Sequence, residues 1–229
     1  VVANADNPGT MDALRGLPLF TFGCAPEADC RAENLTWNRG RPDFDVVVGG
    51  DLYAHLSLRV AGMHNVYNAL AAAAAAYTLG ISGKAVRQGL EGFFGAGRRF
   101  EFKGQFNGAK IYDDYAHHPA ELHALLDMAR TLGYERVICA FQPHTYTRTK
   151  ALFDDFVREL KAADLVVLTD IYAAREKNTI GVSSKELADQ IPGSLYCPSL
   201  GEAADCLREL AQTGDLIITV GAGDIYTVG

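Results

Sequence analysis

Residues 110–119 read Lys-Ile-Tyr-Asp-Asp-Tyr-Ala-His-His-Pro: a short apolar run, a polar cluster, and a proline that suits the first turn of a helix. The same rhythm returns along the second half of the chain. Apolar runs at 137–141, 165–168, 194–196 and 216–220 alternate with helical patterns at 119–132, 150–162, 184–191 and 202–212. Such alternation is typical of βαβ units. With right-handed crossovers it predicts an α/β domain with a doubly wound, mostly parallel, dinucleotide-fold-like sheet.

The first half of the chain has a different pattern. Short, partly alternating runs at 34–38, 45–49 and 55–60 are divided by Gly, Pro and Asp, which predicts a small antiparallel ribbon. Helices are expected at 63–79 and at 82–93, the second with Ser82 as its N-cap. A glycine-rich, basic stretch at 95–100 follows this α+β part, and we place the domain boundary between residues 96 and 97.

Composition narrows the classes of protein. The chain of 229 residues is 48% hydrophobic, as in a globular domain, and its net charge of −7 argues against binding nucleic acid or a broad anionic membrane surface. No apolar run is long enough to span a membrane. Five cysteines without a CxxC pair argue against a zinc site and favour free thiols in a reducing cytosol. No signal peptide is evident. Because the chain starts at Val1 rather than Met, we expect it to be part of a longer product.

The residues after each strand are the first candidates for a site, because parallel α/β sheets bind ligands beyond the carboxyl ends of their strands. Residues 113–119 could orient an amine or a phosphate or move a proton; alternatively, they cap the next helix. Residues 142–150 read Gln-Pro-His-Thr-Tyr-Thr-Arg-Thr-Lys. Here Arg148 could hold a carboxylate or phosphate in bidentate geometry; the alternative is a solvated loop.

Two further stretches follow strands. Residues 169–176 could equally line the site or pack in the interior. Residues 221–224, Gly-Ala-Gly-Asp, resemble half of a dinucleotide fingerprint but lack its third glycine, so we interpret them as a tight turn lining the crevice.

Polar residues also open the first predicted helix. His64 and Asn68 are four residues apart and share a helix face, with Asn65 beside them, so they could hydrogen-bond a purine edge. The alternative is that one residue caps the helix and the others are solvated. No stretch fits a phosphate-binding loop: in residues 80–85 the glycine spacing is wrong, and Ala85 lacks the hydroxyl that ligates Mg²⁺.

Taken together, these motifs resemble those of the Mur ligases, a family of ATP-dependent amino-acid ligases. Residues 62–72 are similar to the family's GxHNxxNxLAA motif, and residues 97–100 resemble its boundary arginine segment. Residues 113–119 and 141–149 resemble the alanine-adding branch. The resemblance implies that residues 1–96 are the C-terminal part of the central, ATP-binding domain and that residues 97–229 are the C-terminal domain.

The resemblance also implies a reaction in the bacterial cytoplasm. ATP, with Mg²⁺, would phosphorylate the carboxylate of UDP-N-acetylmuramate, and L-alanine would attack the acyl phosphate to form an amide for peptidoglycan synthesis. The phosphate loop and the UDP-sugar domain would lie outside this chain, so we expect the chain alone to be inactive. Two alternatives stay open: the related ligase that recycles murein tripeptide, and a non-catalytic module that binds a nucleotide or amino acid.

Site residues follow from the same resemblance. His64, Asn65 and Asn68 would contact adenine or ribose, Arg99 would approach the nucleotide, and Asp114 would act on the nucleotide side. Tyr115, His117 and Arg148 would line the amino-acid end, with His118 and His144 supporting them. Of these, Asp114, His117 and Arg148 are the candidate catalytic residues, and no metal ligand is assigned. Thr145 departs from the many relatives that carry Arg there, so one anion contact would be missing or supplied elsewhere.

Overall fold

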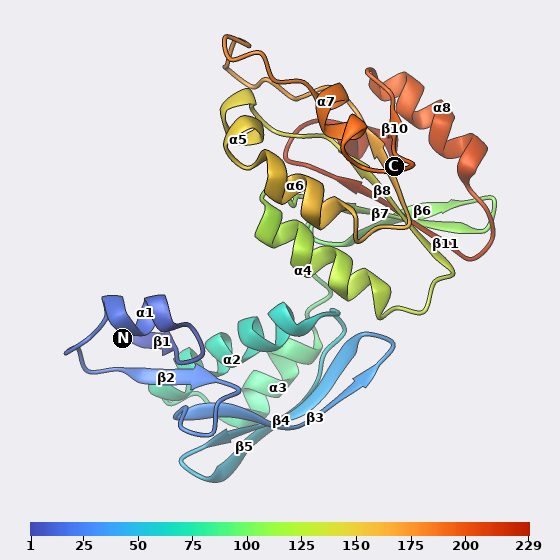
Figure 1. Ribbon diagram of the computed structural model, residues 1–229. Helices are drawn as coiled ribbons and strands as arrows, with labels where there is room; N and C mark the ends of the chain where they lie inside the picture. The colour runs from blue at the N-terminus through green and yellow to red at the C-terminus, as the bar shows by residue number, and fades with distance from the viewer. The chain divides into compact units, whose positions relative to one another are not determined.

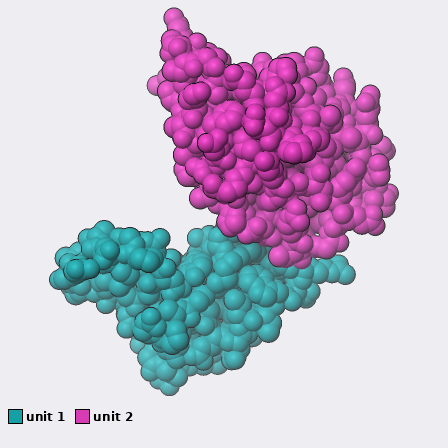
Figure 2. All heavy atoms as spheres, viewed as in Figure 1, with its two compact units in different colours: residues 1–94 teal, residues 95–229 magenta.

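The computed structural model describes residues 1–229, which divide into two compact units, Val1–Phe94 and Gly95–Gly229 (Figures 1 and 2). Each unit has its own sheet and its own packed helices. None of the helices combines the length and the hydropathy that crossing a bilayer requires.

Unit 1 is built on a five-stranded sheet in the order β1–β2–β3–β4–β5. Its strands are β1 (Val2–Asn4), β2 (Phe20–Gly23), β3 (Cys30–Asn38), β4 (Arg41–Val48) and β5 (Asp51–Ser57). β1, β2 and β3 pair in parallel, whereas β3, β4 and β5 form the predicted antiparallel ribbon. These ribbon strands begin earlier than expected, because polar residues such as Arg31 and Asp43 occupy the less buried face and interrupt the apolar runs.

The helices of unit 1 are α1 (Pro8–Ala13), α2 (Met63–Thr78) and α3 (Gly83–Glu91). Buried alanines of α2 allow the helix to lie close to the sheet, and Val66 and Leu70 join Phe44 and Leu56 in one core. Ser82 caps α3 as predicted, accepting the Ala85 amide at 3.4 Å.

Unit 2 contains a six-stranded sheet in the order β10–β9–β8–β11–β7–β6. Its strands are β6 (Glu101–Phe106), β7 (Ala109–Asp114), β8 (Arg136–Phe141), β9 (Leu165–Leu168), β10 (Leu195–Tyr196) and β11 (Asp215–Val220). Every neighbouring pair is parallel except β6–β7, which confirms the mostly parallel sheet. The sequence did not suggest β6, because this edge strand is largely exposed and an irregularity between Phe102 and Gly104 breaks its alternation.

Helices cover both faces of this sheet, so the doubly wound prediction is confirmed (Figure 1). The helices are α4 (Pro119–Arg130), α5 (Tyr146–Ala151), α6 (Phe153–Leu160), α7 (Ser184–Asp189) and α8 (Leu200–Leu210), followed by the 3₁₀ turn η1 (Ile225–Val228). On one face Ile138 and Ile217 pack against Leu207 of α8. Phe141 points to the other face, where its ring lies 5.5 Å from that of Phe156 in α6.

Two predicted boundaries in unit 2 are wrong. The helix expected at 150–162 is two helices, α5 and α6, which meet at Leu152, where φ and ψ are −117° and 23°. α5 begins at Tyr146, so Arg148 lies on a helix and not in a loop. The strand expected at 110–112 runs on to Asp114, because both buried carboxylates at its end have hydrogen-bond donors that compensate their burial.

Candidate functional site

The parallel strands of unit 2 end in one row. Val220 of β11 pairs with both Asp114 and Phe141, and Phe141 pairs with Leu168. The four polar segments that the sequence places after these strands therefore leave the sheet at one edge, where α/β sheets bind ligands.

The guanidinium of Arg148, two imidazoles and two phenol rings gather at this edge. The ring centroids of His117 and His144 lie 6.0 Å apart. Tyr115 packs edge-on to His117 at 5.3 Å, and His144 stacks on Tyr172 at 5.5 Å. Arg148 reaches the same group, with its Nη1 atom 3.5 Å from Nδ1 of His144. Together these side chains can bind an anion through the guanidinium and present ring nitrogens beside it.

His144 is held in its neutral form. Burial lowers its pKa below the usual value, the charge of Arg148 and the neighbouring His117 lower the pKa further, and the carboxylate of Glu176 opposes them. A neutral ring can accept a hydrogen bond from Arg148 at Nδ1. At 3.5 Å that bond is at the limit of hydrogen-bond length, so the Arg148 guanidinium retains capacity for a closer, anionic partner.

The carboxylate of Asp114 accepts hydrogen bonds from two backbone amides. Its two carboxylate oxygens accept the amides of Phe100 and Ala116, each at 2.8 Å. Burial raises the pKa of Asp114, against the opposing effect of these two hydrogen bonds. The carboxylate thus ties the start of unit 2 to the end of β7, and its assignment to the nucleotide side stays a prediction.

The two adjacent histidines have different environments. The Nδ1 atom of His118 accepts the Ala120 amide at 3.3 Å, and Glu121 accepts the amide of His118 at 3.2 Å, which completes a capping box at the start of α4. The contacts of His118 therefore match the alternative interpretation, in which residues 113–119 cap the next helix. His117 instead places Nδ1 2.9 Å from the Tyr115 carbonyl, an acceptor, so Nδ1 carries a proton and donates to that oxygen.

Arg98 also lies at this edge of the sheet, and the sequence did not indicate it as a site residue. Its guanidinium pairs with the fully buried Asp113 at 2.9 Å and donates to the carbonyls of Gly221 at 2.6 Å and Gly223 at 3.2 Å. It also lies over the Tyr115 ring, 4.9 Å from its centroid. Asp113 lies just after the strand predicted at 110–112, and nothing in its local sequence indicates that Arg98 is its partner.

The resemblance implies that Arg99, and not Arg98, approaches the nucleotide. The side chain of Arg99 is exposed. Its guanidinium lies 5.8 Å from the centroid of the Tyr115 ring. The structure therefore places Arg99 beside the aromatic residue of the edge and leaves its role toward a nucleotide as a prediction.

Residues 221–224 form a bend after β11, and Gln142 fastens this bend to the end of β8. The Gln142 amide donates to Asp224 at 2.8 Å and accepts the Ile225 amide at 3.1 Å. A Cβ on Gly223 would lie only 2.2 Å from Oε1 of Gln142 and 2.7 Å from the ring of Tyr172. Glycine is therefore required for packing at this position.

The polar residues of unit 1 contact one another at the start of α2. Asn65 donates to the carbonyl of Ala61 at 2.7 Å and lies 3.1 Å from Nε2 of His64. Asn68 donates to Oδ1 of Asn65 at 3.2 Å. His64 and Asn68 are exposed, so this short network presents polar groups to solvent within unit 1.

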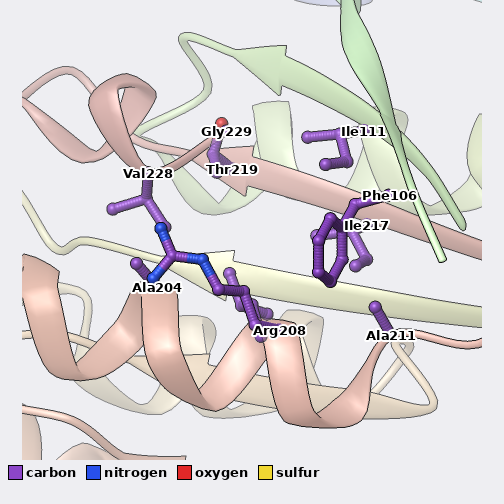
Figure 3. Close-up of a pocket in the computed structure, with 10 residues that line it drawn as sticks. Phe106, Ile111, Ala204, Arg208, Ala211, Ile217, Thr219, Val228 and Gly229 are labelled. Atoms are coloured by element: carbon purple, nitrogen blue, oxygen red, sulfur yellow. The ribbon is translucent and has the colours of Figure 1, made fainter.

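An apolar hollow of about 120 Å³ lies on another part of unit 2 (Figure 3). Its lining comes from β6, β7, β11, α8 and the chain end, and includes Phe106, Ile111, Leu207, Ile217 and Val228. None of the candidate site residues borders it. No group of three or more His, Cys, Asp and Glu side chains in the structure is arranged to hold a metal ion.

The chain matches two known domain families: Mur ligase middle domain over residues 1–76, and Mur ligase, glutamate ligase domain, over residues 98–223. Two curated relatives are UDP-N-acetylmuramate–L-alanine ligases. The one from Caldanaerobacter subterraneus subsp. tengcongensis is 44% identical over 100% of this chain and 51% of its own length. The one from Clostridium novyi is 43% identical with the same coverage, 100% and 51%.

A solved structure is also similar, that of UDP-N-acetylmuramate-alanine ligase MurC from Thermotoga maritima. It matches with a TM-score of 0.81 and 28% identity over 100% of this chain and 49% of its own. The chain spans about half the length of the curated relatives it matches.

Proposed function

Because the chain belongs to the Mur ligase family, we propose that it forms the C-terminal half of a cytoplasmic UDP-N-acetylmuramate–L-alanine ligase. The first relatives that it matches carry that name. The enzyme would use ATP to join L-alanine to UDP-N-acetylmuramate for peptidoglycan synthesis. The γ-phosphoryl group passes to the substrate carboxylate and ADP leaves. The amine of L-alanine then attacks the acyl phosphate, and phosphate leaves as the amide forms.

The arrangement around Arg148 is the observation that carries this proposal. A guanidinium without a close anionic partner faces two imidazoles at the edge of the sheet where ligands bind. Arg148 would hold the carboxylate of L-alanine, and His117 and Tyr115 would line the amino-acid end beside it. His144 is neutral and would support Arg148 without competing for the anion.

The same proposal gives unit 1 a role in binding the nucleotide. His64, Asn65 and Asn68 present amide and imidazole groups at the start of α2, which match the donors and acceptors on a purine edge or a ribose. Arg99 would approach the nucleotide phosphates, and Asp114 would hold the nearby backbone.

Removal of the Arg148 guanidinium tests the proposal in the full-length product of the gene. Arg148→Ala should raise the KM for L-alanine by roughly 10- to 100-fold, because charge-assisted hydrogen bonds contribute about 1.5–3 kcal/mol. The KM values for ATP and for UDP-N-acetylmuramate should stay near wild type. The measurement is release of ADP at varied L-alanine concentration.

Arg158→Ala is the matched control, because Arg158 is an exposed cation of α6 that pairs with Asp155 and Glu159. It should leave the KM for L-alanine unchanged. An Arg148→Ala enzyme with a wild-type KM for L-alanine would contradict the proposed role. Turnover with murein tripeptide in place of L-alanine would identify the recycling ligase instead.

A further inference from the structure

The loops that follow β8 and β9 are joined by backbone hydrogen bonds at the candidate site. The Thr145 amide donates to the Tyr172 carbonyl at 2.9 Å, and the Tyr172 amide donates to the Pro143 carbonyl at 2.8 Å. These bonds form a parallel bridge between His144 and Tyr172, whose rings are stacked. The loop after β9 therefore sets the position of the loop that leads into α5.

The cap of α5 also comes from the loop after β9. The side chain of the N-cap residue, Thr145, makes no capping hydrogen bond, and its backbone has a positive φ of 67°. Glu176 supplies the cap instead, accepting the amide of Thr147 at 2.9 Å and its hydroxyl at 2.5 Å. These hydrogen bonds from Thr147 lower the pKa of Glu176, so its carboxylate is charged at neutral pH.

Arg148 follows Thr147 directly in the first turn of α5. The helix has only six residues, Tyr146–Ala151, and a helix this short has little stability of its own. Its orientation must come from contacts with the rest of unit 2, and Glu176 holds the residue directly before Arg148.

We propose that Glu176 is a positioning residue that sets affinity for the amino acid by capping the turn that presents Arg148. This inference rests on the proposed function, since it takes Arg148 as the partner of the amino-acid carboxylate. Glu176 itself touches no substrate in this scheme. It holds the guanidinium in place through Thr147.

The test compares Glu176→Ala and Glu176→Gln in the full-length product of the gene. Glu176→Ala should raise the KM for L-alanine about fivefold, the factor that corresponds to loss of one helix cap. The kcat at saturating L-alanine and the KM for ATP should change less than twofold. Glu176→Gln keeps an acceptor oxygen for Thr147, so its KM for L-alanine should stay within twofold of wild type.

Glu202→Ala is the matched control, because Glu202 caps α8 by accepting the Ser199 amide at 3.1 Å and is not part of these loops. It should leave the KM for L-alanine unchanged. If Glu176→Ala does not fold, Thr147→Ala takes its place, with Thr147→Ser as the conservative variant. A wild-type KM for L-alanine in Glu176→Ala, or an equal rise in the KM for ATP, overturns the inference. Arg148→Ala measured alongside reports separately on the proposed function.

Discussion

The polar group at the start of α2 and the polar group at the carboxyl edge of the second sheet are held in different ways. In unit 1, the hydrogen bonds of Asn65 and Asn68 join residues one to four positions apart. At the edge in unit 2, Arg98 contacts a carbonyl 125 positions away, and Gln142 contacts Asp224 across 82 positions. The first group follows from its local sequence, whereas the second exists only once the strands have assembled.

Loss of the Arg98 side chain should cause the largest loss of stability among the variants proposed for these two polar groups. Arg98→Ala leaves Asp113 buried without its ion-pair partner, which should cost about 3 kcal/mol. The measurement is amide hydrogen exchange of β11, which reports the opening free energy of unit 2. Arg99→Ala, at the exposed neighbour, should change that free energy by less than about 0.5 kcal/mol. Equal losses in the two variants would show that the long-range contacts of Arg98 do not stabilise the edge.

Asn65→Ala should have a smaller effect. The variant loses the hydrogen bond to Ala61 and the acceptor for Asn68, and we expect a loss of about 1 kcal/mol in unit 1. Trp37 is the only tryptophan of the chain and lies in unit 1, so urea unfolding followed by its fluorescence measures this change. Asn68→Ala, at an exposed position, should cost less than about 0.5 kcal/mol. If Asn65→Ala and Arg98→Ala cost the same free energy of unfolding, the local hydrogen bonds of unit 1 would stabilise the protein as much as the long-range contacts of unit 2.

The smallest expected effect is a shift in the titration of His144. Burial, then Arg148 and His117, place its pKa below the usual 6.5, and NMR of the ring protons should show this. Arg148→Ala should move the pKa upward, while burial keeps it below 6.5. In the unfolded chain His144 binds a proton more readily, so its contribution to stability falls as the pH drops from about 6.5 toward the lowered pKa. A pKa of 6.5 or higher would contradict the burial of His144 and the effect of the neighbouring Arg148.

The sequence predicted the elements with regular periodicity and missed those set by tertiary contacts. The parallel strands, α4 and the cap at Ser82 follow from local pattern. The break at Leu152 and the early start of α5 do not, because Glu176 of another loop caps that helix. Among the residues at this edge, the sequence indicated Arg148 through its chemistry and His144 through the family resemblance. Arg98 and Glu176 could not, because their partners are distant in sequence.

The two edge strands of the second sheet, β10 and β6, affect how readily the protein aggregates at high concentration. β10 has only two residues, and β6 departs from regular pairing between Phe102 and Gly104, with Lys103 at the irregularity. A short strand and a bulged, lysine-bearing strand both present few consecutive amides to an incoming chain. Phe102 and Phe106 are exposed on β6, yet the backbone beside them is a poor template for a β-strand from another molecule. Unit 2 thus combines exposed aromatic rings with a sheet protected against edge-to-edge aggregation.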